Sequence, residues 1–291
     1  NESNTRSASS SKRDPGSPQA APGTDRIIDS PLLSASGFRH AFFSRQGGVS
    51  APPYDSLNFS VTVGDREPDV AANLSRAASD LRCDPNHLVF LHQVHGVDCH
   101  IVHHPDDSPS IRNRSGDAVL SRHPEVACAV RVADCAPILI GDLRSGAVAA
   151  VHSGWRGTLQ DIASVALRTL ERLTGAPLDP VVAVGPHIEA CCFEVGHDVA
   201  AQLRDASPDP DILRTGKRDR PHVDLRAMIH AQLLRAGGRE DRIDHVRGCT
   251  VCDRERFFSY RRDGKRGGRH LAAIGRDGSL ERGGRYCGLT S

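Results

Sequence analysis

The 291-residue sequence is poor in aromatic side chains, which make up only 4% of it and include one Trp and three Tyr. It also lacks a net charge of one sign, since 37 Lys and Arg residues stand against 36 Asp and Glu residues. A groove for single-stranded nucleic acid uses aromatic rings that stack on bases and a surplus of positive charge. We therefore expect no nucleic-acid partner.

Long apolar runs are missing as well. No run approaches the ~20 residues of a membrane-spanning helix, and the first residues lack the apolar segment of a secretory signal. The nine cysteines are odd in number and too sparse for the disulfide framework of a small secreted domain. These absences predict a cytoplasmic protein with reduced thiols and no membrane partner.

The composition changes once along the chain. Residues 1–26 contain Ser, Pro, Ala and charged residues but no large apolar side chain, so they cannot bury enough surface to offset the entropy cost of ordering. We expect a disordered tail over residues 1–26 and a single catalytic domain over residues 27–291.

The rest of the sequence alternates between short apolar runs and amphipathic segments, which is typical of one mixed α/β domain. Strands are predicted at residues 38–44, 88–91, 127–132, 136–140, 147–151, 181–184 and 257–262, and helices at residues 69–81, 158–173 and 224–235.

Three short segments place possible metal ligands beside predicted strand ends: His95 before Gly96, Cys135 between two apolar runs, and His152 at the end of another. The turn at residues 141–146 allows a hairpin that returns His152 to the level of Cys135. Two imidazoles and one thiolate with a free fourth position are typical of catalytic zinc. The alternative is that these are ordinary core or surface residues.

Other cysteines are less informative. Cys249 and Cys252 form a Cys-x-x-Cys pair without a second such pair, so ordinary thiols are the preferred interpretation. Adjacent side chains point in different directions in most backbones, so we expect at most one of Cys191 and Cys192 to join a site.

Two arginines adjoin glycine-rich turns and are candidates for binding an anion. Arg45 precedes Gly47, and Arg156 precedes Gly157. Backbone N–H groups in such turns approach phosphate closely, and Arg binds it through two hydrogen bonds. The pattern matches neither a Walker loop nor a dinucleotide fingerprint. Arg261 and Arg262 are expected at a solvated edge.

Eight motifs occur together in one order and resemble the bacterial YfiH/YlmD-like proteins, also labelled polyphenol oxidases or laccase-domain proteins. They are SRQGGVS at 44–50, YDSLN at 54–58, QVHG at 93–96, ADC at 133–135, HSGWRG at 152–157, GP at 185–186, FEVG at 193–196 and FFSYRR at 257–262. The resemblance spans about residues 36–275. It departs at Leu74, where the family often has Arg, and in the stretch after Ile188, which lacks a usual glycine.

The resemblance implies a four-layer α/β/β/α fold with mixed sheets and a zinc site whose motifs fall on His95, Cys135 and His152. It also implies phosphorolysis of adenosine, inosine, guanosine and methylthioadenosine, together with deamination of adenosine. Purine nucleosides and phosphate are then the expected partners.

Roles for further residues follow as hypotheses. Asp134 is a candidate for moving a proton, with a turn cap as its alternative role. Arg45 is the first candidate for holding phosphate in the reaction, with Arg156 second, and Asn58 is a candidate for hydrogen bonding to ribose or base.

Two alternatives stay open. A hydrolase that edits peptidoglycan precursors would use Cys135 as nucleophile and His152 as base. A laccase-like polyphenol oxidase would use copper, although the 15 histidines include no His-x-His pair of the kind that several coppers require.

Overall fold

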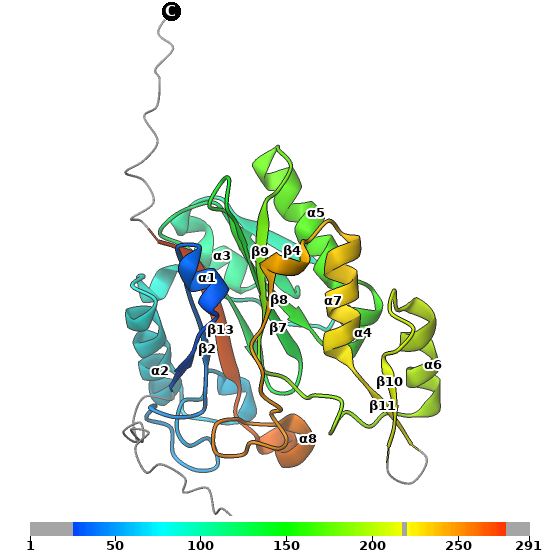
Figure 1. The fold of residues 1–291 in the computed structure, drawn as a ribbon. Helices are drawn as coiled ribbons and strands as arrows, with labels where there is room; N and C mark the ends of the chain where they lie inside the picture. The colour runs from blue at the N-terminus through cyan, green and yellow to red at the C-terminus, as the bar shows by residue number, and fades with distance from the viewer. Residues whose placement is uncertain (1–25, 217–219, 278–291) are drawn as a thin grey trace, which may run out of the picture.

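The computed structural model describes residues 26–216 and 220–277 (Figure 1). The predicted tail, apart from Arg26, lies outside the described residues. Two mixed sheets form the centre of the fold. The five-stranded sheet has the order β1 (Ile27–Ile28), β2 (Phe38–Phe43), β13 (His270–Arg276), β6 (Ala127–Val132) and β3 (Leu88–Val89).

The six-stranded sheet has the order β12 (Ile243–His245), β9 (Pro180–Val184), β7 (Ala136–Asp142), β8 (Val148–Ser153), β5 (Ala118–Ser121) and β4 (Cys99–Val102). Strand pairs β3–β6, β4–β5 and β9–β12 are parallel, and the other pairs within these two sheets are antiparallel. A separate small ribbon pairs β10 (Leu213–Thr215) with β11 (Pro221–Val223).

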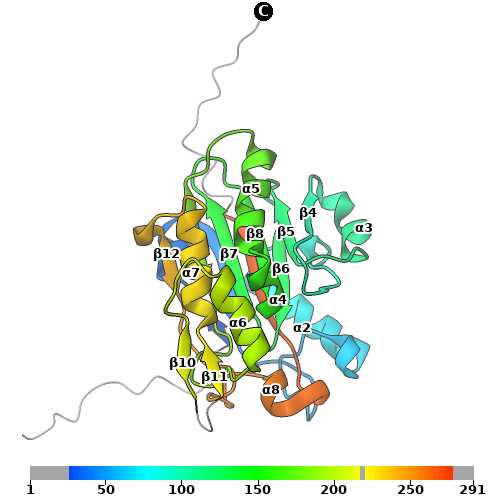
Figure 2. The ribbon, with the colours of Figure 1, turned by 90° about the vertical axis from the view of Figure 1, so that its right-hand side faces the viewer.

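Helices cover the outer faces of both sheets, which gives four layers (Figures 1 and 2). The α2 helix (Glu67–Asp80) packs on the five-stranded sheet, and α5 (Ile162–Thr174) and α7 (Leu225–Arg235) pack on the six-stranded sheet. The predicted four-layer fold is confirmed. The remaining helices are α1 (Pro31–Ala35), α3 (Ser108–Arg112), α4 (Trp155–Leu159), α6 (His197–Ala206) and α8 (Tyr260–Asp263).

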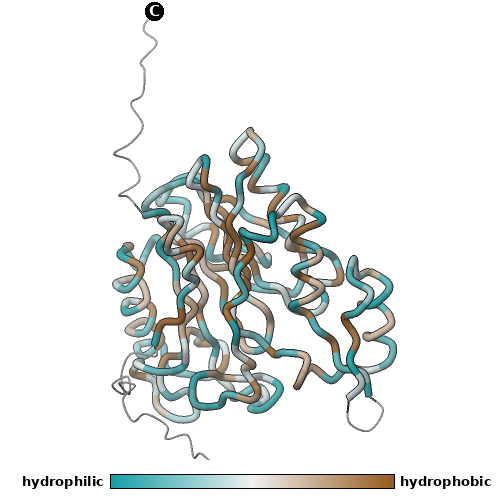
Figure 3. Tube along the Cα trace, in the orientation of Figure 1, coloured by the Kyte–Doolittle hydropathy of each residue, from teal (hydrophilic) through white to brown (hydrophobic). Residues whose placement is uncertain are grey.

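Apolar side chains between the layers hold the fold together. One cluster fills the space between the sheets and includes Phe42, Val130, Leu139 and Ile274, each at most 3% exposed. Every residue of β7 is buried, because this strand is covered on both faces, and this explains why its sequence is a nearly continuous apolar run. The central strands are accordingly coloured mostly brown, as hydrophobic, in Figure 3.

Two predicted elements differ from the structure. The single helix expected at 158–173 is divided into α4 and α5, because Asp161 adopts a left-handed backbone with φ 60° and its side chain accepts a hydrogen bond from Ser164 N–H. The strand expected at 257–262 is wrong. Phe257 is buried in a loop, and Ser259 caps the short helix α8.

The described residues contain no helix that is both long and apolar enough to cross a membrane.

Candidate metal centre and active site

The hairpin of β7 and β8 brings two of the three predicted ligands to one end of the six-stranded sheet. Pro137 pairs with His152 in this hairpin, so Cys135, two residues before Pro137, lies near His152. His95 arrives from the loop between β3 and β4. One ligand atom from each of these three residues lies within 4.8 Å of the others. The structure therefore brings together the trio His95, Cys135 and His152.

A buried carboxylate orients this trio. Asp117, which is 0% exposed and immediately precedes β5, accepts a hydrogen bond from His152 Nδ1 over 2.7 Å. The same carboxylate accepts backbone N–H bonds from Val94, His95 and Gly96 over 3.2, 2.9 and 2.7 Å. Asp117 thus holds the His95 loop and the His152 ring with one side chain. Because Nδ1 of His152 faces Asp117, Nε2 is the nitrogen available to a metal.

The charges of the trio reflect these contacts. Burial opposes a charged His152, but the Cys135 thiolate and the Asp117 hydrogen bond outweigh it and raise the pKa of His152 to about 9. Burial and the neighbouring His152 lower the pKa of His95. Burial of Asp117 is likewise outweighed by its hydrogen bond to His152, which keeps the pKa of Asp117 below its usual value. His95 thus presents a neutral imidazole, the form that binds metal, whereas His152 carries both ring protons until a metal at Nε2 would displace one of them.

Gly154 leaves space beside these three side chains. A Cβ atom at this position would lie 3.1 Å from Cys135 Sγ, 3.5 Å from His95 Cδ2 and 3.8 Å from His152 Cε1. The first of these contacts is tight, so a larger residue would press on the thiol. The donor set and this space both fit a single zinc ion with an open coordination position.

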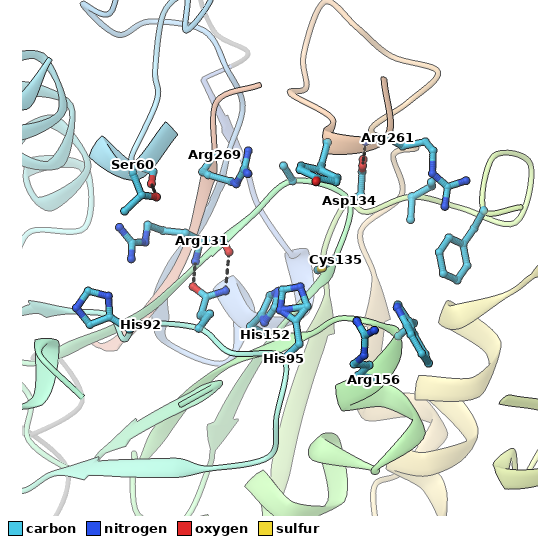
Figure 4. Close-up of a pocket in the computed structure, with 17 residues that line it drawn as sticks. Ser60, His92, His95, Arg131, Asp134, Cys135, His152, Arg156, Arg261 and Arg269 are labelled. Atoms are coloured by element: carbon cyan, nitrogen blue, oxygen red, sulfur yellow. Dashed lines mark hydrogen bonds between the residues drawn. The ribbon is translucent and has the colours of Figure 1, made fainter. Parts of the chain in front are cut away.

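The trio lies on the wall of a cavity of about 620 Å³ (Figure 4). Its lining also contains four arginines (Arg131, Arg156, Arg261 and Arg269) and three larger aromatic side chains (Trp155, Phe193 and Tyr260). Asp134 is the only acidic residue among the lining residues. Within the described ranges, none of the four arginines forms a salt bridge, so the cavity carries an excess of positive charge.

Figure 4 shows Arg131 and Arg269 on one side of the trio. Burial and the charge of nearby Arg269 lower the pKa of Arg131 to about 10. Burial also lowers the pKa of Arg269. Two half-buried guanidinium groups that repel each other would both be stabilised by a bound anion. This side of the cavity is therefore suited to a small anion.

Arg156 and Asp134, two of the residues predicted for the site, line the cavity. The Arg156 guanidinium lies 4.3 Å from the centroid of the Trp155 ring. Both carboxylate oxygens of Asp134 are occupied: one accepts from Thr250 Oγ1 and the other from Arg261 N–H, each over 2.6 Å. Asp134 thus fixes Arg261 at the cavity.

Arg45 and Asn58 are not among the lining residues. The Arg45 guanidinium donates to the Asp55 carbonyl over 2.8 Å, pairs with the Asp55 carboxylate over 3.2 Å, and lies 4.5 Å from the Phe258 ring centroid. Asn58 is fully buried, and its Oδ1 accepts the Arg269 N–H over 2.8 Å. Asn58 therefore acts on the cavity through the backbone of Arg269.

Several residues of the site were not identified from the sequence. One feature of the sequence could have indicated Asp117: it is an acidic residue directly before an apolar run. Asp134 has a similar position directly before Cys135. Arg261, expected at a solvated edge, is exposed and also lines the cavity. Arg131 lies within an apolar strand and Arg269 directly before one, and neither position indicates a shared site.

Comparison with known proteins identifies the family of the chain. A family model described as multi-copper polyphenol oxidoreductase laccase matches residues 39–277. A protein of Deinococcus radiodurans named purine nucleoside phosphorylase is 38% identical over 247 residues, which are 84% of this chain and 92% of the relative.

Two solved structures share the fold. The crystal structure of YlmD from Geobacillus stearothermophilus has a TM-score of 0.79 and 32% identity, covering 87% of this chain and 99% of that chain. The crystal structure of the hypothetical protein YfiH from Bacillus licheniformis has a TM-score of 0.80 and 28% identity, covering 87% of this chain and 97% of that chain. Together with the family match, these likenesses show that the chain belongs to the laccase-domain family of YlmD and YfiH.

Proposed function

We propose that this chain is a zinc-dependent purine nucleoside phosphorylase, which replaces the purine of a nucleoside with phosphate. One observation carries the proposal: a single cavity combines the His/Cys/His trio with four arginines and three larger aromatic side chains. Phosphate requires cationic groups and a purine requires apolar rings. The name of the Deinococcus relative supports the same reaction class.

The lining residues form two groups, one suited to binding phosphate and the other to binding the purine. Phosphate binds to Arg131 and Arg269, on one side of the trio (Figure 4). The purine lies against the aromatic side chains of the lining, beside Trp155 and Phe193. A phosphate oxygen then bonds to the anomeric carbon of ribose while the bond from that carbon to the purine nitrogen breaks. The leaving purine takes up a proton, and the products are the free base and ribose-1-phosphate.

His95, Cys135 and His152 hold the zinc ion in this proposal. Zinc in such a site supplies Lewis acidity and lowers the pKa of water to near 7, which suits the deamination of adenosine that we propose as a second reaction. Asp117 contributes by fixing the tautomer and orientation of His152. Asp134 contributes by holding Arg261 at the cavity.

The proposal is tested with the purified full chain. Adenosine, inosine, guanosine and methylthioadenosine are each incubated with and without inorganic phosphate. We expect free base and ribose-1-phosphate only when phosphate is present, with 5-methylthioribose-1-phosphate as the sugar product of methylthioadenosine, and conversion of adenosine to inosine in both conditions. Release of base without phosphate, or no turnover of any nucleoside, contradicts the proposal.

The phosphate site gives a second test. Replacing Arg131 with glutamine removes a charged donor whose hydrogen bond to phosphate stabilises binding by about 1.5–3 kcal/mol, so we expect a roughly 10- to 150-fold increase in the KM for phosphate. The KM for inosine should change much less. Arg168→Gln is the matched control, because Arg168 is exposed on α5 outside the cavity. Equal effects of both substitutions contradict this placement of phosphate.

A cysteine hydrolase is the second candidate function. The interaction between His152 and Cys135, which raises the pKa of His152, also fits a nucleophile and its base. Iodoacetamide separates the two functions. A free thiolate reacts at once, whereas a thiolate bound to metal is protected until a chelator is added. We expect protection of Cys135.

A further inference from the structure

A second group of side chains with metal-binding chemistry lies apart from the trio. Its sulfur atoms all lie within 4.8 Å of one another and belong to Cys191, Cys192, Cys249 and Cys252. The expectation that at most one of Cys191 and Cys192 joins a site is wrong, because their Sγ atoms lie 3.7 Å apart. We call this group the four-cysteine cluster.

The distances within the cluster match those of a tetrahedral metal site. The Sγ atom of Cys252 lies 3.7 Å from that of Cys191 and 3.3 Å from that of Cys192. Four Zn–S bonds of about 2.3 Å in a tetrahedron place the sulfur atoms about 3.8 Å apart. A disulfide requires about 2.05 Å between sulfurs. The thiols are thus spaced for a shared ion and are too far apart for a covalent bond.

Backbone pairing brings the two cysteine-bearing segments side by side. His187 N–H donates to the Gly248 carbonyl, and Thr250 N–H donates to the His187 carbonyl, each over 3.1 Å. This pairing holds the turn that contains Cys191 and Cys192 against the turn of the Cys-x-x-Cys pair. The cluster is therefore set by main-chain hydrogen bonds, independently of any ligand.

Backbone N–H groups surround one sulfur of the cluster. Those of Glu189, Val251 and Cys252 donate hydrogen bonds to the Cys249 sulfur. Such N–H groups, including those two and three residues after the first cysteine of the pair, stabilise negative charge on sulfur.

Two guanidinium groups lie next to the cluster, and one of them, that of Arg262, is also paired with the Asp263 carboxylate over 2.7 Å. Arg261 donates to the Cys192 carbonyl over 3.3 Å, and Arg262 donates to the carbonyls of Thr250 and Val251 over 2.9 and 3.2 Å. Four thiolates around a divalent cation carry a net charge of −2, so adjacent cations favour the loaded state. Cys191 and Cys252 are exposed, which gives the ion a path of entry.

We propose that the four-cysteine cluster is a second metal site, which binds one zinc ion through four thiolates. Sulfur ligands alone select soft or borderline cations, and four protein ligands leave no position open for a substrate. The role of this site is structural, in contrast to that of the trio.

The four-cysteine cluster adjoins residues that form one wall of the active-site cavity. Ile188 and Phe193, which flank the turn of Cys191 and Cys192, both line the cavity. On the other segment, Thr250 donates to Asp134, which in turn holds Arg261. Zinc that joins the two turns would fix this wall.

Zinc content of the purified full chain tests the proposal. We expect about two zinc ions per chain for the native sequence and about one for Cys252→Ser, because a tetrathiolate site that loses one ligand binds zinc far more weakly. Cys135→Ala should also retain about one ion, held by the four cysteines. Cys83→Ser is the matched control, since this thiol belongs to neither group, and should retain about two.

Cobalt substitution distinguishes the two sites by a readout other than activity. Four of the five cysteine sulfurs in the two groups belong to the cluster, so the sulfur-to-cobalt charge-transfer absorption should largely persist in Cys135→Ala and largely disappear in Cys252→Ser. The melting temperature of Cys252→Ser should fall by about 5 °C or more.

Three results overturn the proposal: zinc content unchanged by Cys252→Ser, charge-transfer absorption that depends only on Cys135, or thiol titration that reveals a disulfide within the cluster before reduction. None of these bears on turnover of nucleosides. If Cys135→Ala keeps the full metal content while Cys252→Ser loses one ion, the catalytic zinc is contradicted and the structural zinc is supported.

Discussion

Cys135→Ala is expected to lower kcat/KM for phosphate-dependent cleavage of inosine by at least ~10³-fold. Cys135 is the only sulfur of the trio, so its loss leaves two imidazoles, which hold zinc weakly. A catalytic metal contributes several kcal/mol to transition-state stabilisation, and each ~1.4 kcal/mol corresponds to a factor of ten in rate. Activity is measured at saturating phosphate, and zinc is quantified in the same samples.

The Cys83→Ser variant serves as the control, because Cys83 packs beside α2 on the five-stranded sheet and belongs to neither group of possible metal ligands. It should keep the activity and metal content of the native chain. If Cys135→Ala retains activity within about threefold of native, the trio does not hold the catalytic metal, since loss of a ligand to a Lewis acid costs more than ~1 kcal/mol.

Asp117→Asn should cause a loss of zinc affinity at the trio of about 10- to 100-fold, which is typical for partners of ligating histidines. An asparagine keeps the shape of Asp117 but not its charge. If its amide nitrogen faces His152, Nδ1 must accept a hydrogen bond, and the proton moves to Nε2, the nitrogen needed by the metal.

Competition with a chelator of known affinity measures this loss, in a chain that also carries Cys252→Ser so that only the trio binds zinc. Asp142→Asn is the matched control, because Asp142 is 1% exposed and accepts hydrogen bonds from Ser145 and Asp179 at the far end of the β7–β8 hairpin. It should reduce stability without changing zinc affinity. Equal zinc affinity in Asp117→Asn and the native chain would contradict the positioning role.

Elements with a strong local pattern were predictable from the sequence. The hairpin at residues 141–146 followed from turn residues between two apolar runs, and it predicted that Cys135 and His152 meet. The α7 helix was predicted at residues 224–235, and the structure shows that the Asp224 side chain caps it by accepting from Ala227 N–H. In these cases local preference and tertiary packing favour the same structure.

Other features depend on contacts that a pattern does not encode. Asp161 divides a segment with continuous helical spacing, because its backbone takes a left-handed conformation. Phe257 and Phe258 resemble strand residues, yet their rings pack against His270 at centroid distances of 5.5 and 5.2 Å in a loop. In both cases tertiary packing overrides the local preference.

The parts of the site that escaped prediction join segments that are distant along the chain. Arg131 and Arg269 meet only because β6 and β13 are neighbours in one sheet. The four-cysteine cluster depends on a backbone contact between His187 and Cys249. Cysteine spacing along the sequence therefore underestimated the number of available sulfur ligands.

The three residues from Ala133 to Cys135 are the whole connection between β6 in one sheet and β7 in the other. His95 follows β3 of the first sheet, whereas His152 belongs to β8 of the second. An ion bound by these side chains would thus connect the two sheets. The distances between its ligands would then depend on how closely the two sheets pack against each other. A substitution that changes the packing between the sheets, for example at Phe42 or Ile274, would then change the distances between the metal ligands.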